Sequence, residues 1–286
     1  MDSIEENENW DLVVKPTTSL FDIDIKELWK YRDLILLFVK RDFVSVYKQT
    51  ILGPLWFFIQ PILTTITFTI VFGNIAQIST DGTPKVLFYL AGVTAWSYFS
   101  ECLNTTSNTF INNSNIFGKV YFPRLTVPIS IVISNLIKFA IQFILFVLFI
   151  LFYIIKGNEN VHPNLYILFL PVLLLLMAML ALGAGIIISA FTTKYRDLRF
   201  LITFGIQLLM YATPVVYPLS LLKGNYRLIV LANPMTSIIE TFKYAFTGSG
   251  TFSYLYLLYS SVFSIILLTI AILIFNKVEK TFMDTV

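Results

Sequence analysis

Long uncharged apolar runs are the feature that most constrains the fold of this chain. They recur along the sequence, and several extend for about 20 residues or more without a charged side chain. A helix rises about 1.5 Å per residue, so each such run is long enough to cross about 30 Å of hydrocarbon. Only 13% of the 286 residues are charged, roughly half the fraction found in soluble domains. The sequence therefore predicts an all-α integral membrane protein.

The apolar runs predict six transmembrane helices within one domain at 51–276. The second run is too short to cross alone, so its helix must continue through Glu101 into the polar stretch "CLNTTSNTF". Burying unpaired polar groups in lipid costs several kcal/mol, so this helix should face protein or water. In the fourth span Gly183, Gly185 and Ala190 should let neighbouring helices approach closely. The predicted spans are 51–73, 86 to about 109, 125–155, 165–192, 200–222 and 254–275.

Between the fifth and sixth spans the pattern predicts broken helices. Pro214 and Pro218 should end the fifth helix, since proline removes a backbone donor and clashes with the preceding turn. The run "LIVLANPMTSII" is too short to cross and predicts a re-entrant pair of half-helices that turns at Asn233 and Pro234. An exposed segment, 240–253, is expected to follow.

The residues that precede the first span divide into two parts. Residues 1–24 are acidic and lack the basic and apolar regions of a signal peptide. Residues 25–50 repeat apolar residues at three- and four-residue steps, which indicates an amphipathic helix at the membrane surface anchored by Leu28, Leu36 and Phe43. The alternative is a helix packed on its own domain. Residues 277–286 form a short C-terminal tail.

Basic residues indicate the orientation of the chain. With the amino terminus inside, about fourteen of the twenty Lys and Arg lie in cytoplasmic segments, as the positive-inside rule requires. Both termini are then cytoplasmic. The charged stretches "KVYFPR" and "TKYRDLR" share that face, and the proline-broken region from Pro214 to 251 lies on the outer face.

The sequence excludes several classes of chemistry. It holds one cysteine and one histidine, too few for an HExxH zinc centre or a cysteine metal site. It has no GxxxxGK[ST] nucleotide loop and no GxSxG elbow, and Glu101 is essentially the only acid within the spans. The charge of +3 does not suggest nucleic acid. We therefore expect no enzyme, no metal and no cofactor on this chain, and energy from another subunit.

Two charged features within this plan carry open alternatives. In "KVYFPR", Val120, Tyr121 and Phe122 are suited to fill a groove on a soluble partner while the two cations stay at the headgroups, but an interfacial anchor of aromatic and basic residues has the same composition. Lys138 lies deep in the third span. It should either pair with Glu101 or face a polar cavity.

Four stretches in order resemble one family. "VYKQTILGPLWFFIQPILTTITFTIVFG", "KVYFPRLTVPIS", "YRDLRFL" and "NPMTSIIETFKYAF" are similar to the permease of bacterial polysaccharide ABC exporters, the Wzm-like group that exports O-antigen, capsule or teichoic acid. The resemblance implies a homodimer in the bacterial inner membrane that moves lipid-linked polysaccharide. It also implies two copies of a partner ATPase, on which ATP and Mg²⁺ would bind.

The resemblance also assigns roles to residues of this chain. The family pattern carries an acid where this chain has Lys138, so the sign of that charge is reversed. Any single aromatic among the channel candidates could instead face lipid. The implied ATPase-coupling residues are Lys119, Val120, Tyr121, Phe122, Arg124, Tyr195, Arg196, Asp197 and Arg199; the implied channel lining is Trp56, Phe57, Gln60, Phe68, Tyr211 and Tyr217; the implied periplasmic gate holds Pro214, Pro218, Asn233 and Pro234.

Two other functions remain open at this stage. One is a permease of the same type-2 ABC architecture that exports a drug or a small lipid. The other is a multispanning glycosyltransferase or acyltransferase, against which the missing acid pair speaks.

Overall fold

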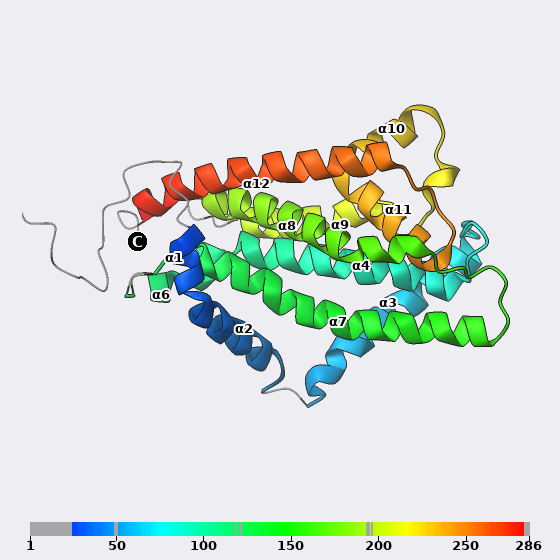
Figure 1. The fold of residues 1–286 in the computed structure, drawn as a ribbon, viewed down its shortest axis with the longest axis horizontal. Helices are drawn as coiled ribbons and strands as arrows, with labels where there is room; N and C mark the ends of the chain where they lie inside the picture. Colours follow the sequence, from blue (N-terminus) through cyan, green and yellow to red (C-terminus); the bar gives the residue numbers. More distant parts are fainter. Residues whose placement is uncertain are drawn as a thin grey trace, which may run out of the picture.

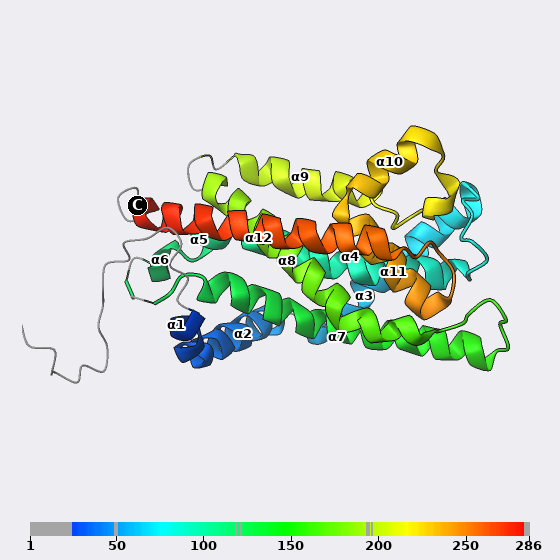
Figure 2. The same cartoon turned by 45° about the horizontal axis from the view of Figure 1, so that its top comes forward.

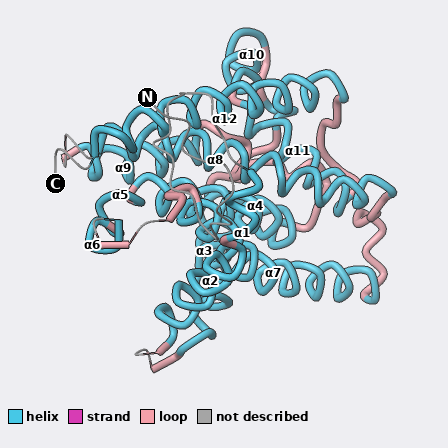
Figure 3. Tube along the Cα trace, turned by 60° about the vertical axis from the view of Figure 1, so that its left-hand side comes forward, coloured by secondary structure: helices cyan, strands magenta, loops and turns pink. Residues whose placement is uncertain are grey.

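The computed structural model describes residues 25–48, 51–117, 119–120, 122–192, 195 and 197–282. At 25–27, 46–47 and 278–282 it describes the backbone alone. All the regular secondary structure within these residues is helical, as the tube in Figure 3 shows. The acidic segment 1–24 and the last four residues lie outside the described part.

Five long helices form the body of the molecule and match five of the predicted spans. Each is long and apolar enough to cross a membrane, so the chain is an all-helical, multi-pass membrane protein. The five are η1 (Gly53–Leu55) continued by α3 (Trp56–Phe68) and the wider π-turn helix η2 (Thr69–Ile75); α4 (Lys85–Ser107); α7 (Thr126–Ile155); η3 (Leu165–Phe169) continued by α8 (Leu170–Thr192); and α12 (Tyr254–Phe282).

The bundle has two distinct ends, which Figure 1 places at the left and right. We call the left end, which carries α1 (Ile25–Lys30), α6 (Ser114–Phe117) and the C-terminal part of α12, the terminal end. The right end carries the loop after η2, the loop after α7 and helix α10 (Gly224–Ala232), and we call it the far end. The first described helix and the end of the last one thus lie at the same end of the bundle.

The fifth predicted span is a shorter helix than expected. Helix α9 (Leu198–Tyr211) has 14 residues, about 21 Å of rise, and is not one of the five helices long enough to cross. The chain then leaves helical geometry through Pro214 and Pro218 to the single turn η4 (Leu219–Leu221). Figure 2 shows α9 running beside the bundle towards α10. A crossing over 200–222 thus stays a prediction.

Two helices follow the proline-broken segment, and they separate where the sequence predicted. Helix α10 ends at Ala232, and α11 (Pro234–Thr247) begins with Pro234 in its first turn after the Asn233 cap. The expectation that 240–253 is exposed was wrong. Residues 240–247 are buried apart from the half-buried Tyr244, because α11 packs against α4, α8 and α12 rather than lying on the surface.

Helix α4 lies at the centre of the bundle. It packs against α3, α7, α8 and α11, and 78% of its most apolar 18-residue window is buried inside the protein. Its polar C-terminal turns face protein, as predicted, with Thr106 and Ser107 fully buried and only Glu101 exposed. In α8, Gly183 lies against α12 and Gly185 against α4, which confirms the prediction of close helix approach.

The predicted amphipathic leader is two helices that break at Tyr31. Helix α2 (Arg32–Tyr47) packs along α7 and buries Phe38 and Val39. Leu36 and Leu37 remain exposed, and Figure 3 shows α2 reaching away from the main bundle. The predicted anchors Leu28 and Phe43 are half-buried. The leader is thus packed on its own domain along one face, and its lipid contact stays a prediction.

Candidate functional site

The first predicted coupling segment lies at the terminal end, between α6 and α7, and has an outer and an inner face. Lys119 and Val120 are on the outer face, where Val120 is 59% exposed. Phe122 is only 5% exposed, and Arg124 is also buried. Tyr121 lies outside the described residues. The buried ring of Phe122 is thus unavailable to fill a groove on another protein, whereas Val120 can do so.

Phe122 belongs to a group of apolar side chains that we call the terminal cluster. Its ring centroid lies 5.8 Å from that of Phe38 in α2 and 5.8 Å from that of Phe117 in α6. Phe110 stacks on Phe275 of α12 with centroids 5.2 Å apart. The buried members are Phe38, Phe110, Phe117, Phe122, Val127, Ile131, Ile186, Ala271 and Phe275. Phe122 therefore contacts α2 through Phe38 and is linked to α12 through Phe117 and Phe110.

Two arginines cover the terminal cluster. The guanidinium carbon of Arg41 lies 4.7 Å from the Phe38 ring centroid, and its Nη2 donates a hydrogen bond to Asn113 Oδ1 at 3.5 Å. The guanidinium carbon of Arg124 lies 5.7 Å from the Phe117 ring centroid. Cations over aromatic faces are attracted to the ring quadrupole. Arg124 thus packs on the interior of this end, and its coupling role stays a prediction.

The second predicted coupling segment precedes α9 at the same end. Asp197 caps α9, with its Oδ1 accepting a hydrogen bond from the backbone N–H of Leu198 at 3.1 Å. Tyr195 and Arg199 are exposed. Arg196 lies outside the described residues. The fold thus brings both charged segments, far apart in the sequence, to one end of the bundle (Figures 1 and 2).

The predicted channel residues separate into exposed and buried groups. Trp56, Gln60 and Tyr211 are exposed. Phe57 is buried with its ring stacked on Phe43, centroids 6.1 Å apart, and Phe68 is buried in the main core. Tyr217 is half-buried. The exposed three can meet a substrate or a second chain, whereas Phe57 and Phe68 are occupied by packing within this chain.

Helix α9 presents apolar residues that sequence reasoning passed over. It has no buried residue, and Phe200 and Phe204 are both largely exposed. An amphipathic pattern in the sequence does not distinguish an aromatic ring that faces lipid from one that faces a channel. Only the position of α9 on the outside of the bundle draws attention to these two rings.

The two charged residues predicted inside the spans do not pair. Glu101 is exposed and Lys138 is half-buried, and no ion pair joins them among the described residues. The other alternative, in which Lys138 faces a polar cavity, stays a prediction.

The predicted gate residues are joined at the far end. Pro214 and Pro218 are buried, and Pro234 is half-buried. Asn233 caps α11 by accepting a hydrogen bond from Met235 N–H at 3.0 Å, and its Nδ2 donates to Thr213 Oγ1 at 2.8 Å. The break between the two helices is thus tied directly to the segment that follows α9.

Two buried charged residues of α11 were missed by sequence reasoning. Glu240 is 1% exposed and Lys243 is 2% exposed. Glu240 Oε2 accepts hydrogen bonds from Thr251 N–H at 3.2 Å and Thr251 Oγ1 at 3.0 Å. Burial raises the pKa of the Glu240 carboxyl and lowers that of the Lys243 ammonium. Their spacing of three on an otherwise uncharged helix was the available signal.

Hydrogen bonds from the loop after η2 complete the far end. The Asp81 carboxylate accepts from Ser220 Oγ at 2.8 Å, and Thr83 Oγ1 is hydrogen-bonded to Ser249 Oγ. This loop is thereby joined both to the segment after α9 and to the segment after α11. Movement of any one of the three would disturb the others.

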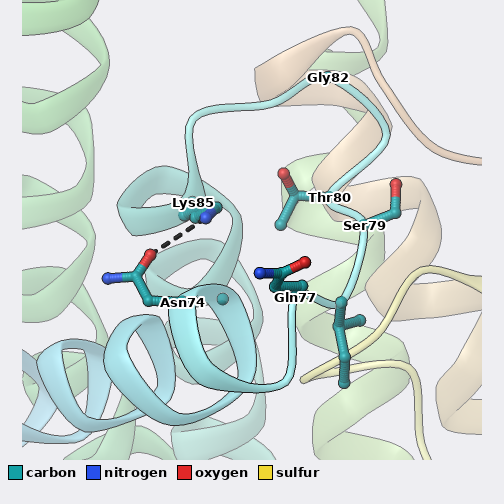
Figure 4. A pocket seen from close by; sticks show the side chains of 8 residues that line it. Asn74, Gln77, Ser79, Thr80, Gly82 and Lys85 are labelled. Carbon is teal, nitrogen blue, oxygen red and sulfur yellow. Dashed lines mark hydrogen bonds between the residues drawn. The ribbon is translucent and has the colours of Figure 1, made fainter.

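A polar hollow of about 470 Å³ opens beside this loop, between η2 and the start of α4 (Figure 4). Asn74, Gln77, Ser79 and Lys85 line it, and Lys85 Nζ donates to Asn74 Oδ1 at 3.0 Å. Gly73 leaves room for the lysine stem, because an added Cβ would lie 3.0 Å from Lys85 Cδ. The lining offers hydrogen-bonding groups rather than apolar surface. No group of acidic, histidine or cysteine residues suited to a metal occurs in the described part.

Comparisons with known proteins place this arrangement among transporters. Residues 33–247 match the family described as ABC-2 type transporter. The O-antigen export system permease protein RfbA of Myxococcus xanthus is 26% identical over 264 residues, which cover 92% of this chain and 98% of that protein. The protein of the same name from Klebsiella pneumoniae is 26% identical over 254 residues, covering 88% of this chain and 94% of the relative. Because the family match spans well over half of the 286 residues, the chain belongs to the ABC-2 type transporter family.

Proposed function

We propose that this chain is the membrane-spanning permease subunit of an ATP-driven exporter that moves lipid-linked polysaccharide, of the O-antigen or capsule kind, out of the cytoplasm across the bacterial inner membrane. The observation that carries the proposal is the likeness to permeases named for O-antigen export, which extends over nearly the full length of both chains. The chain has no nucleotide loop of its own. ATP and Mg²⁺ therefore belong to a separate ATPase subunit, of which two copies are expected.

The terminal end is the proposed docking surface for that ATPase. Both charged segments reach it, and they expose Val120, Tyr195 and Arg199 there. Behind them the terminal cluster joins the first segment to α2 and α12. We therefore assign Val120 to contact with the ATPase and Phe122 to transmission of its movement within this chain.

The proposed path for the glycan lies between two copies of this chain. Helix α9 has no buried residue within one copy, and the exposed residues Trp56, Gln60 and Tyr211 lie on the first and fifth helices. Sugar C–H faces stack on aromatic rings and sugar hydroxyls bond to polar groups. Weak repeated contacts of this kind suit a long polymer, because conduction requires release as well as binding.

Six crossings complete the proposed topology, with both termini cytoplasmic. The fifth consists of α9 continued by the irregular residues 212–222. Helices α10 and α11 then form the outer gate as a re-entrant pair. Irregular backbone at membrane depth is tolerated where it is buried in protein or lines a cavity, and residues 213–216 are buried.

Deletion of the gene tests the proposed function. The surface of the deletion strain should lose one glycan, and the corresponding lipid-linked polymer should accumulate inside the cell. Silver-stained gels of surface polysaccharide and mass spectrometry of extracted lipid-linked sugars measure both. Restoration by a copy of this gene at another locus excludes an effect on neighbouring genes.

Two outcomes would contradict the proposal. An unchanged surface glycan would refute polysaccharide export, and if it came with greater drug sensitivity it would favour the small-molecule exporter of the same architecture. Loss of the glycan without internal lipid-linked polymer would instead indicate a defect in synthesis, as expected of a transferase.

A further inference from the structure

The fifth helix ends at Tyr211, and Ala212 and Thr213 donate hydrogen bonds to its carbonyls at 208, 209 and 210. The carbonyls of the irregular segment that follows need donors from elsewhere. After Tyr211 the chain bends through 212–218, where prolines at positions 214 and 218 supply no N–H. Carbonyls in buried irregular backbone lack helical partners and must be satisfied by other groups. Residues 213–216 are buried.

Lys243 of α11 provides the missing donors. Its Nζ donates a hydrogen bond to the carbonyl of Pro214 at 2.6 Å and lies 3.3 Å from the carbonyl of Val215. The same nitrogen lies 3.6 Å from the centroid of the Phe88 ring on α4. An ammonium group has three N–H donors, enough to serve both carbonyls while its charge lies over the ring. One buried charge thus joins α11, α4 and the end of the fifth crossing.

Gly92 of α4 gives independent support for this junction. A Cβ added there would lie 2.8 Å from the carbonyl oxygen of Val215 and 3.3 Å from its Cα. Both are backbone atoms, which have no rotamer by which to move away. The absence of a side chain at position 92 therefore lets the Val215 carbonyl lie against α4, within reach of the lysine.

We propose that Lys243 is a positioning residue for export: it holds the segment 212–218 between α11 and α4, and thereby fixes where Tyr211 and Tyr217 stand at the outer mouth of the path. This inference rests on the transport function proposed above. It adds that the outer end opens only when the ammonium releases the two carbonyls. Charge-assisted hydrogen bonds are about twice as strong as neutral ones, so this contact favours the arrangement seen in this structure.

A buried reporter thiol next to the junction tests the proposal without any measurement of transport. Val216 is 3% exposed, so a Val216→Cys thiol should react with a maleimide only when the segment opens. The native Cys102 is fully buried on α4 and serves as an internal control in the same molecule. Full-length protein in lipid nanodiscs is labelled over time, and mass spectrometry assigns the label to each thiol.

Lys243→Met should raise the labelling rate of the reporter at least about ten-fold, because lost hydrogen bonds to a charged donor shift a local opening equilibrium by that much. Labelling of Cys102 should stay unchanged. Lys243→Arg, which keeps the charge and the donors, should restore at least half of the protection. The matched control is Lys223→Met, which removes an exposed lysine at the same end and should have no effect.

Gly92→Ala provides a second variant that leaves the lysine in place. It should also speed labelling of the reporter, because the added methyl pushes the Val215 carbonyl away from α4. Gly205→Ala is its control, since nothing lies within 4 Å of an added Cβ at position 205. Unchanged reporter labelling in both Lys243→Met and Gly92→Ala would overturn the proposal. So would equal acceleration at Cys102, which would indicate global unfolding.

Export is measured separately in cells that carry each variant. Lys243→Met should lower surface glycan at least about ten-fold per molecule of permease, and Lys243→Arg should recover it, since the outer mouth is misplaced only when the charge is lost. Normal export by Lys243→Met would overturn the positioning role even if labelling changed. If the wild-type chain exports no glycan, the function proposed above fails, but the labelling result still decides whether Lys243 holds the segment.

Discussion

At the scale of single residues, Gly185 marks a close approach of α4 and α8. An added Cβ would lie 2.6 Å from Cβ of Thr106 and 2.8 Å from its Cγ2. Thr106 is fully buried and branched at Cβ, so it has little freedom to move. Gly185→Ala should therefore destabilise the detergent-solubilised protein by about 1–3 kcal/mol through overpacking, measured as a lower midpoint of thermal unfolding. Gly205→Ala should leave the midpoint unchanged or slightly higher, and an equal midpoint for the two variants would contradict the packing argument.

The sequence could predict such residues only by type. Small residues in an apolar run indicated close approach, and Gly183 and Gly185 confirmed it, but the partner helices became known only from the fold. Trp56 and Phe57 are adjacent and chemically alike, yet one is exposed and the other buried, because burial depends on α2 and Phe43. Lys243 shows the same limit, because a helix with only two charged residues is compatible with a surface position as well as with a buried one.

At the scale of elements, the loop before α7 should separate docking from transmission. Phe122→Ala removes a buried ring of the terminal cluster and should lower stability by about 3–5 kcal/mol. Val120→Ala changes an exposed side chain and should keep stability within about 0.5 kcal/mol while weakening association with the ATPase. Thermal unfolding and co-purification of the tagged ATPase measure the two effects. Loss of association in Phe122→Ala with unaltered stability would reverse this assignment.

Element boundaries followed from the sequence where hydropathy alone decides them. The third and fourth spans were predicted to within a residue or two, and the break at Asn233 followed from an asparagine cap and a proline. The fifth helix ends at Tyr211, before Pro214, as the two prolines predicted, whereas the crossing over 200–222 stays a prediction. The second half of α11, from position 240 on, was expected on the surface and is buried, because the partners of its Glu and Lys are known only from the fold.

At the scale of the whole molecule, the terminal end should face the cytoplasm. A Lys119→Cys thiol at that end and a Glu159→Cys thiol in the loop after α7 report on opposite sides, and both positions are exposed. With basic residues retained inside, an impermeant maleimide should label only position 159 in intact spheroplasts and both positions after permeabilisation. The wild-type chain, with the buried Cys102 alone, gives the background. Labelling of position 119 rather than 159 in intact spheroplasts would show that the orientation is the opposite one.

The predicted even number of crossings implies that both termini lie on one side, and the first and last described helices do lie at one end of the bundle. The exposed rings of α9 and α3 are equally suited to lipid and to another subunit, because lipid tails are as apolar as a packed protein surface.

Helix α4 is the least apolar of the five candidate spans and the most buried, and this combination bears on how the protein is made. During synthesis α4 emerges before α7, α8 and α11, the helices that later surround its polar side chains. Held in lipid alone, Thr94 and Ser107 would lie against hydrocarbon. Helix α4 is therefore made early but becomes stable in the bilayer only after the helices that follow it. A nascent chain released after α4 should leave the membrane or be degraded. The early helices of this protein are stable in the bilayer only after the later helices have packed around them.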